Sequence, residues 1–590
     1  MKKYLAVIIA AFSVLGIMGG CKSTQTSNSE TSGTAVNTTP ITACVGSEPA
    51  SIDPAINQTV DGATYIVHLF EGLERVNNKN QIVPGIAKSA PNISSDGLTY
   101  TYTLRDAEWS DGKPVTAGDF VYAWQRDVNP KTASQYAYQL YYIKNAQEIN
   151  AQALDASGNP EKVKFGADGN PVLDAKGNSI ADPNGKYISA KADGSAIWLD
   201  DLGIKATDNN TVVVTLAAPC AYFDQIAAFP TLYPVRKDIV EANPNTWATD
   251  PKTIIGDGPF VVSSWTHSSQ IVMKKSSTYW DKANVVPTEI DWLLMDNADS
   301  ILSAYKNGRL DLADTVPPDE IPSLVKSGDC KIFGNLGTYY FDLNTKKAPF
   351  NDVKVREALS LAFDRQYLVN SVSKGGQLAA GAFVPTGVPD ATAGSDFRKI
   401  GGNFYDPTTA AYKANVKKAQ GLLTQAGFPG GKGFPTVELK YNTNPLHKAI
   451  AEYMQSEWKT NLGINITLVN EDFSVLVTDR NKKNYQIARD GWLGDYSDAM
   501  TFIDMFTSTS GNNNTGWSDS KYDSLTKDAL TNTNEAKRMT DMHSAEKILM
   551  NNWVVIPVFY YTDPMLVSKN IQGFVQSALG FKYLMWTSVK

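Results

Sequence analysis

Side chains suited to nucleophilic or metal chemistry are few in this 590-residue chain, which holds four histidines and four cysteines. The sequence contains no Gly-x-Ser-x-Gly elbow, no His-Glu-x-x-His, no Walker loop and no Cys-x-x-Cys pair. His68 and His543 fall in apolar, helical contexts where packing is the expected role, and His267 and His447 have no obvious partner by spacing. We therefore predict that the protein is not an enzyme and has no metal site and no cofactor.

Cys21 is the one cysteine whose surroundings predict a modification. The chain opens Met1-Lys2-Lys3, runs apolar from Tyr4 to Met18 and then reads Gly19-Gly20-Cys21. A positive start, a short apolar region and small residues at its end are typical of a secretory signal. The cysteine makes the segment resemble a bacterial lipobox, although Met18 and Gly19 stand where Leu and then Ala or Ser are usual. Lipidation of Cys21 is expected; the alternative is an ordinary signal peptide with a chance cysteine.

The composition narrows the class and the compartment. Residues 22–40 are rich in Ser, Thr, Gly and Asn, which predicts a flexible tether. No later stretch of about 20 apolar residues occurs, so a lipid-anchored body at the outer face of the cell membrane is expected. The net charge of −7 argues against nucleic-acid binding. The length predicts about three or more domains.

Hydrophobic periodicity predicts a mixture of strands and helices. Alternating apolar residues predict strands at 100–104, 212–216, 464–468 and 485–488. Helical periodicity or capping signals predict helices at 116–126, 351–365 and 447–462. Thr116 and Asp119 form a capping pair, and Gly463 is a C-terminal stop. The fold class is therefore α/β or α+β with several domains.

The stretch 155–195 differs from the rest of the chain. Clusters of Gly, Asn and Pro recur about every ten residues, as in Asp168-Gly169-Asn170-Pro171, which predicts a hairpin-rich surface insertion. A calcium loop is the alternative, but the spacing lacks the closing acidic residue of an EF-hand. Once Cys21 is set aside, Cys44, Cys220 and Cys330 are an odd set; they are free, or two of them pair.

Ordered motifs from about Ser47 to the C-terminus carry a family resemblance. They include Ser47-Glu48-Pro49, Leu69-Phe70-Glu71-Gly72-Leu73, Trp109-Ser110-Asp111-Gly112-Lys113-Pro114, Gly256-Asp257-Gly258-Pro259-Phe260, Tyr279-Trp280-Asp281 and Ala348-Pro349-Phe350-Asn351-Asp352-Val353. With them the chain resembles the oligopeptide-binding proteins of bacterial ABC importers, the family 5 extracytoplasmic solute-binding class that also has dipeptide- and nickel-binding members.

The resemblance implies a two-lobed periplasmic-binding-protein fold with an extra α+β domain. It places a signal peptide at 1–20, the tether at 21–41, lobe I at 42–85, 205–333 and 560–590, the extra domain at 86–204 and lobe II at 334–559. The two hinge segments would lie near Gly334 to Gly337 and near Val558 to Tyr561. Some members carry a disulfide that cannot form here, because Leu493 occupies one cysteine's place and leaves Cys330 without a partner.

The resemblance also implies how the two ends of a peptide are bound. In the family an aspartate of a Gly-Trp-x-x-Asp-Tyr segment binds the peptide α-amino group; here the segment is Gly491 to Tyr496 and the aspartate is Asp495. The positions matching the family's carboxylate-binding cations are Arg489, Arg480, His447 and Lys347. The alternatives are a turn aspartate that caps its own backbone and cations that are solvated surface charges.

Backbone and pocket roles follow the same resemblance. The segment Gly337 to Asn344 is similar to the strand to which peptides add in the family. The residues implied for backbone contacts or side-chain pockets, some of which could equally be core, are Tyr339, Tyr340, Phe341, Trp492, Gly494, Phe473 and Tyr136.

The expected function is capture of oligopeptides in a closing cleft and delivery to the permease of an ABC transporter by a lipid-anchored monomer. The sequence leaves two rival functions. One is a related binder of dipeptides, signalling peptides, a nickel complex, haem or sugar, and the other is a secreted hydrolase. Asp495 and the several cations favour a peptide with free ends, and the missing nucleophile motif disfavours a hydrolase.

Overall fold

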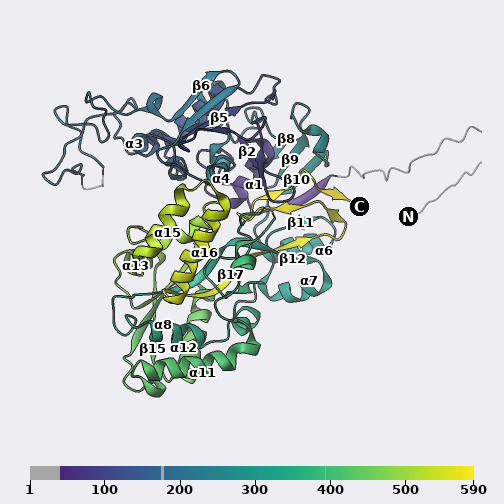
Figure 1. The fold of residues 1–590 in the computed structure, drawn as a ribbon. Coiled ribbons are helices and arrows are strands. Elements are labelled where there is room, and N and C mark those ends of the chain that lie inside the picture. Colours follow the sequence, from purple (N-terminus) through teal and green to yellow (C-terminus); the bar gives the residue numbers. More distant parts are fainter. Residues whose placement is uncertain (1–39, 175–177, 393) are drawn as a thin grey trace, which may run out of the picture. The chain divides into compact units, whose positions relative to one another are not determined.

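The computed structural model describes residues 40–174, 178–392 and 394–590, without the side chains of residues 473 and 474 (Figure 1). Cys21 and the segments expected to be the signal peptide and most of the tether lie outside the described residues. All described residues belong to one compact unit, Asn37–Lys590.

An eleven-stranded mixed sheet runs through the described part of the chain, with strand order β15-β14-β16-β12-β17-β11-β1-β10-β9-β8 and β13 beside β17. The strand bounds are β1 Ile41–Cys44, β8 Phe260–Thr266, β9 Gln270–Lys275, β10 Glu289–Leu293, β11 Leu312–Ala313, β12 Cys330–Leu343, β13 Leu378–Ala379, β14 Val437–Asn442, β15 Ile466–Glu471, β16 Ile487–Leu493 and β17 Val555–Val567. Parallel and antiparallel pairs occur together, which confirms the mixed α/β class.

The long strands β12 and β17 lie antiparallel at the middle of this sheet (Figure 1). Their pairing register shifts between Gly334 and Thr338, within the segment where the first hinge crossing is expected. On its other edge β12 pairs with β16, from Gly337 opposite Leu493 to Leu343 opposite Ile487. Residues 338–342 of β12 therefore have a strand on each side.

A four-stranded antiparallel sheet, of order β4-β5-β7-β6, forms in the region expected to be the extra domain. Its strands are β4 Asn92–Ile93, β5 Thr99–Thr103, β6 Ile204–Asp208 and β7 Thr211–Thr215. The predicted helix appears as α2, Ala117–Val128, and the Asp119 carboxylate accepts hydrogen bonds from the Thr116 N–H (2.8 Å) and hydroxyl (3.0 Å).

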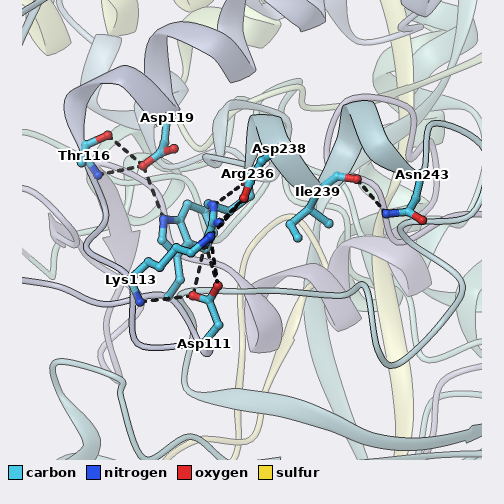
Figure 2. A network of polar contacts seen from close by, with 9 residues as sticks. Asp111, Lys113, Thr116, Asp119, Arg236, Asp238, Ile239 and Asn243 are labelled. Carbon is cyan, nitrogen blue, oxygen red and sulfur yellow. Dashed lines mark hydrogen bonds and ion pairs between the residues drawn. The ribbon is translucent and has the colours of Figure 1, made fainter.

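A polar network ties the loop before α2 to the helix α5, Lys237–Ala242 (Figure 2). The Arg236 guanidinium donates to the carboxylates of Asp111 and Asp238, and Lys113 also contacts Asp238. The guanidinium lies 5.9 Å from the ring centre of Trp109. The Trp-Ser-Asp-Gly-Lys-Pro motif thus holds two segments together.

The helices that pack on the β12–β17 half of the sheet match the sequence prediction in part. The predicted helix at 447–462 is α12, Pro445–Leu462, and it ends at Gly463, whose φ of 72° is left-handed. The single helix predicted for 351–365 is wrong, since the chain forms α8, Val353–Leu361, and a separate short α9, Arg365–Tyr367. Asp364 interrupts the run because its carboxylate caps α9 through the Tyr367 N–H.

The remaining α-helices of the described residues are α1 Val60–Leu69, α3 Ala146–Asn150, α4 Phe223–Ala227, α6 Ala298–Lys306, α7 Ile321–Ser327, α10 Phe397–Gly401, α11 Thr409–Gln425, α13 Phe473–Asn481, α14 Met500–Ile503, α15 Ser520–Thr531 and α16 Glu535–Asn551. Short helices of other types also occur, among them the 3-10 helix Ala137–Leu140. Small two-stranded sheets complete the fold: β2 Glu74–Val76 with β3 Ile82–Pro84, β18 Ile571–Gln572 with β21 Ser588–Val589, and β19 Val575–Gln576 with β20 Lys582–Tyr583.

In the described residues of the stretch 155–195, which leave out 175–177, tight turns are joined by isolated β-bridges, such as Phe165 with Pro171 and Leu173 with Ser179. Asp155, Asp168 and Asp193 each accept a hydrogen bond from a backbone N–H of their own turn. These carboxylates therefore have a structural role in the turns.

The histidine and cysteine predictions can be compared with their surroundings. His68 is 1% exposed within α1, and burial lowers its pKa to about 4, so the predicted packing role is confirmed. His543 contacts Asp390 at 2.8 Å and stacks on Phe397. Cys44, Cys220 and Cys330 are buried free thiols, and burial raises the pKa of each. None of the helices in the described ranges is long and apolar enough to span a bilayer.

Candidate functional site

Asp495 lies two residues beyond the end of β16, in the bend that leads to α14. Its N–H donates to the Thr501 hydroxyl at 3.2 Å, which fixes the bend. The Tyr138 hydroxyl donates to Oδ1 of Asp495 at 3.3 Å, and the Gln139 amide donates to the Asp495 carbonyl at 3.4 Å. Burial raises the pKa of Asp495 to about 6, against the smaller, opposite effect of the Tyr138 hydrogen bond. Within the described residues, Asp495 has no cationic partner.

A cavity of about 150 Å³ adjoins this carboxylate. Its walls come from segments far apart in the sequence: Asn57, Gln58, Thr59, Val60, Ala63, Tyr136, Phe229, Pro230, Thr231, Asn335, Leu336, Leu493, Gly494, Asp495, Leu579 and Phe581. Asp495 is the only charged residue in that wall. The cavity thus combines one carboxylate with a largely apolar lining, which suits a positively charged group attached to an apolar one.

The alternation of β16 places Arg489, Gly491 and Leu493 on one face of the sheet and Asp490 and Trp492 on the other. Arg489 is paired with Phe341 of β12, and Gly491 with Tyr339. Leu493 reaches the cavity wall, and Arg489 lies four residues earlier on the same face, roughly 13 Å along the strand. A carboxylate and a guanidinium are therefore positioned at two points along one strand and the bend that follows it.

Arg489 lies over the ring of Tyr339, with its guanidinium carbon 4.8 Å from the ring centre. It donates to the Tyr561 hydroxyl at 3.3 Å and to the Asn442 side-chain oxygen at 3.5 Å. No carboxylate pairs with it among the described residues, and its buried Nε has no partner there. A half-buried guanidinium with neutral neighbours can take an anionic ligand.

His447 lies close to Arg489, near the start of α12. Its Nδ1 is 3.3 Å from the Tyr339 hydroxyl. Burial, assisted by the nearby Arg489 charge, lowers the pKa of His447 to about 4, so the ring is neutral at pH 7. His447 can therefore offer a hydrogen bond in this position, while Arg489 supplies the charge.

The structure does not bring the other two predicted cations into this group. Arg480, on α13, is 9% exposed and forms an ion pair with Asp490, whose side chain belongs to the opposite face of the sheet from Arg489. Lys347 is exposed in the turn after β12. Both therefore lie away from Arg489 and His447 in this arrangement.

The expectation that a peptide strand adds to residues 337–344 of β12 needs correction. Residues 338–342 are paired with β16 on one edge and β17 on the other, so their backbone groups are already satisfied. Tyr340 packs edge-on against Phe383, and Phe341 is fully buried. Tyr339 is 1% exposed, and its ring packs against the Arg489 guanidinium. These three aromatics are core residues here.

The remaining pocket predictions divide between the cavity and the core. Tyr136 and Gly494 line the cavity. A Cβ on Gly494 would lie 2.6 Å from the Leu336 side chain, so the close approach requires glycine. Trp492 points the other way and donates from Nε1 to the Thr501 hydroxyl at 3.3 Å. The side chain of Phe473 lies outside the described residues.

Sequence reasoning missed three residues of the site. Leu493, which is 56% exposed, lines the cavity; Tyr138 contacts Asp495; and Tyr561 contacts Arg489. The period of two along β16 could have placed Leu493 on the face of Arg489. Nothing in the local sequence signals Tyr138 or Tyr561, because each meets its partner across a long stretch of chain.

A second, larger cavity of about 540 Å³ shares Phe229, Leu579 and Phe581 with the first. The β2–β3 hairpin, the segment before α10 and α10 itself line it, with Lys79, Asp396 and Lys399 among the wall residues. No group of three or more His, Cys, Asp or Glu side chains that could hold a metal ion occurs in the residues that the structure describes.

Three comparisons with known proteins agree with one another. Residues 81–514 match the model of bacterial extracellular solute-binding proteins, family 5. The chain is 32% identical to the oligopeptide-binding protein OppA of Bacillus subtilis over 592 residues, which cover 99% of each chain. The structure is similar to the unliganded open form of the murein tripeptide-binding protein MppA (TM-score 0.78, 30% identity, 95% of this chain and 99% of that one).

A further solved structure bears on the conformation of the chain. Haemophilus influenzae OppA in complex with the peptide RPPGFSPFR aligns with a TM-score of 0.64 at 28% identity, covering 94% of this chain and 99% of that one. The two relatives are about equally similar in sequence, so the higher TM-score with the open form reflects the arrangement of the elements. The described residues therefore adopt an arrangement like that of an open, unliganded relative.

Proposed function

Since the chain belongs to family 5 of the bacterial extracellular solute-binding proteins, we propose that it captures oligopeptides outside the cytoplasm and delivers them to the permease of an ABC importer. The two-lobed fold of the family is the scaffold for this role. The observation that carries the proposal is the pair of unsatisfied charges, Asp495 and Arg489, on one strand and the bend after it.

A free peptide has an ammonium group at one end and a carboxylate at the other, joined by a chain of little charge. Asp495 takes the ammonium, because a charge enclosed in a closed cleft needs an opposite charge. Arg489 takes the carboxylate with its guanidinium fork, and His447 adds a neutral hydrogen-bonding partner. The separation of Asp495 and Arg489 along the chain sets the room available for the peptide between them.

The same geometry distinguishes a peptide from the other ligands considered. A nickel complex or haem needs metal-coordinating or ring-stacking groups at the centre of the site, and a sugar needs no pair of opposite charges. In this site the two charges stand apart and have no counter-ion among the described residues. Free peptide termini satisfy both.

Closure of the lobes over the peptide completes the mechanism. The open and closed arrangements differ by a few kcal/mol in such proteins, and a ligand that contacts both lobes shifts the population toward the closed one. We place lobe I at 42–85, 205–333 and 560–590, the extra domain at 86–204 and lobe II at 334–559. The closed form then docks on the permease. Lipidation of Cys21 keeps the monomeric protein at the membrane, and no bond of the peptide is made or broken.

Incubation of the purified protein with a peptide mixture, followed by native mass spectrometry, tests this function. We expect one intact peptide per chain, which is released unchanged on denaturation. Cleaved peptides would indicate a hydrolase, and retention of a non-peptide solute in preference to all peptides would contradict the proposal.

A further inference from the structure

The cavity beside Asp495 has a single charged side chain in its wall and many apolar ones. Eight of its wall residues are aliphatic, phenylalanine or proline side chains: Val60, Ala63, Phe229, Pro230, Leu336, Leu493, Leu579 and Phe581. The polar members of the wall are uncharged apart from Asp495 itself. Val60 and Leu493 are 39% and 56% exposed, so apolar surface that would normally be buried faces the cavity.

We propose that this cavity selects an apolar first residue in the bound peptide and that Leu493 is a principal determinant of the selection. This inference rests on the proposed function, because it takes Asp495 as the group that binds the peptide ammonium. It goes further in naming the class of peptide: chains that begin with an aliphatic or aromatic residue.

The position of the first side chain follows from covalent geometry. The side chain of the first residue branches from the carbon atom that carries the ammonium group. When that ammonium group contacts Asp495, the side chain begins within one further bond, while the peptide continues along β16 toward Arg489. The space open to the side chain is thus the cavity to which Asp495 itself belongs.

The size of the cavity agrees with this assignment. An apolar cavity of about 150 Å³ accommodates a benzene-sized group, and the cavity here has a volume of about 150 Å³. A leucine or phenylalanine side chain therefore fills the cavity. It covers the exposed apolar surface of Leu493 and Val60, which is thereby removed from water. Glycine leaves that surface uncovered.

Electrostatics disfavours acidic first residues. No lysine, arginine or histidine lines the cavity, so an aspartate or glutamate side chain would be desolvated beside the Asp495 carboxylate without a cation. A lysine side chain has no carboxylate there besides Asp495, which is already engaged by the ammonium group. Both charged classes should bind more weakly than the apolar ones.

Isothermal calorimetry on pentapeptides that differ only at the first residue tests the inference. We expect peptides that begin with phenylalanine or leucine to bind at least tenfold more tightly than peptides that begin with glycine or aspartate. Leu493→Ser should reduce at least threefold the ratio between the affinities of the phenylalanine peptide and the glycine peptide. Val475→Ser is the matched control, since Val475 is a similarly exposed (47%) apolar residue on α13 outside the cavity wall. It should leave the ratio unchanged.

Each peptide is also measured with an acetylated amino terminus, which separates the two levels of the argument. Strong loss on acetylation together with equal affinity for all first residues would overturn the selection by the cavity and leave the peptide site intact. No loss on acetylation would overturn the role of Asp495. An unchanged ratio in Leu493→Ser would remove Leu493 as a determinant.

Discussion

The Tyr138 hydroxyl donates a hydrogen bond to Oδ1 of Asp495 across 357 positions of sequence, at 3.3 Å. Tyr138 lies in the short helix Ala137–Leu140, in the region assigned to the extra domain, whereas Asp495 follows a strand of the large sheet. The contact supplies the carboxylate with a neutral donor in the open arrangement. It thereby lowers the cost of holding Asp495 ready for a ligand cation.

Peptide affinity should depend on pH through Asp495. Burial raises the pKa of this carboxyl to about 6, so it is mostly ionised at pH 7 and protonated below pH 6. Only the ionised form attracts an ammonium group. The peptide carboxyl (pKa about 3.5) and amine (pKa about 8) change little between pH 5 and 7. We expect affinity to be constant near pH 7 and to fall by up to tenfold per pH unit below about pH 6, measured by calorimetry.

Tyr138→Phe provides the control for this profile. The hydrogen bond from Tyr138 lowers the pKa of Asp495, so its removal should move the midpoint of the affinity profile to higher pH. A profile that is flat from pH 5 to 7 in the unmodified protein would contradict the assignment of Asp495 as the titrating group.

Arg489→Gln should weaken the binding of peptides with a free carboxyl terminus at least tenfold, or about 1.4 kcal/mol. The guanidinium has no carboxylate partner among the described residues, so its loss leaves no buried carboxylate unpaired and should spare the fold. Carboxyl-terminally amidated peptides lack the negative charge, so their affinity should fall little in the variant. Affinities for both peptide forms in both proteins give the coupling directly.

Arg480→Gln is the informative comparison, because the two arginines come from neighbouring elements with different surroundings. Arg480 forms a buried ion pair with Asp490, and its removal should lower the free energy of unfolding by about 3–5 kcal/mol. The ratio of free to amidated peptide affinity should stay as in the unmodified protein. A selective loss of carboxylate recognition in Arg480→Gln would instead place this residue at the peptide terminus.

Glu74→Gln should stabilise the protein at neutral pH. Glu74 is 3% exposed in β2, and burial raises the pKa of its carboxyl to about 8. The unfolded chain releases this proton near pH 4.3, so the contribution of Glu74 to stability is present below that pH and is lost as the pH rises toward 8. The free energy of unfolding of the variant should exceed that of the unmodified protein by on the order of 2 kcal/mol at pH 7.5 and by little at pH 4.5.

Urea unfolding at the two pH values measures this difference. Glu438→Gln is the matched control, since Glu438 is exposed on β14. It should leave the stability nearly unchanged at both values. An equal gain from Glu74→Gln at pH 4.5 and 7.5 would show that the effect comes from packing and not from ionisation.

The sequence predicted the elements whose periodicity is strong and local. The helix of α12 with its Gly463 stop and the strand of β7 were predicted to within a few residues, because burial of one face leaves a regular pattern. The predicted helix 351–365 was wrong because Asp364 makes a cap within an otherwise helical run. Local side-chain capping competes with helix continuation in a way that periodicity does not register.

The site was predictable where one strand supplies it and was unpredictable where segments meet. Asp495 and Arg489 are named by one contiguous motif; the structure places Arg489 on β16 and Asp495 in the bend after it, and their binding roles stay predictions. The resemblance implies ligand contacts for Tyr340 and Phe341, yet pairing of β12 on both edges buries them in the core. Tyr138 and Leu579 approach the site from distant segments, and only tertiary structure places them there.

The most direct test of the account compares Asp495→Asn with the unmodified protein, using one peptide with a free amino terminus and the same peptide acetylated. Calorimetry at pH 7.5 should show at least a tenfold loss for the free peptide in the variant, about 1.4 kcal/mol, and little difference between the two proteins for the acetylated form. Equal affinity of the free peptide for both proteins would contradict the claim that Asp495 binds the peptide ammonium.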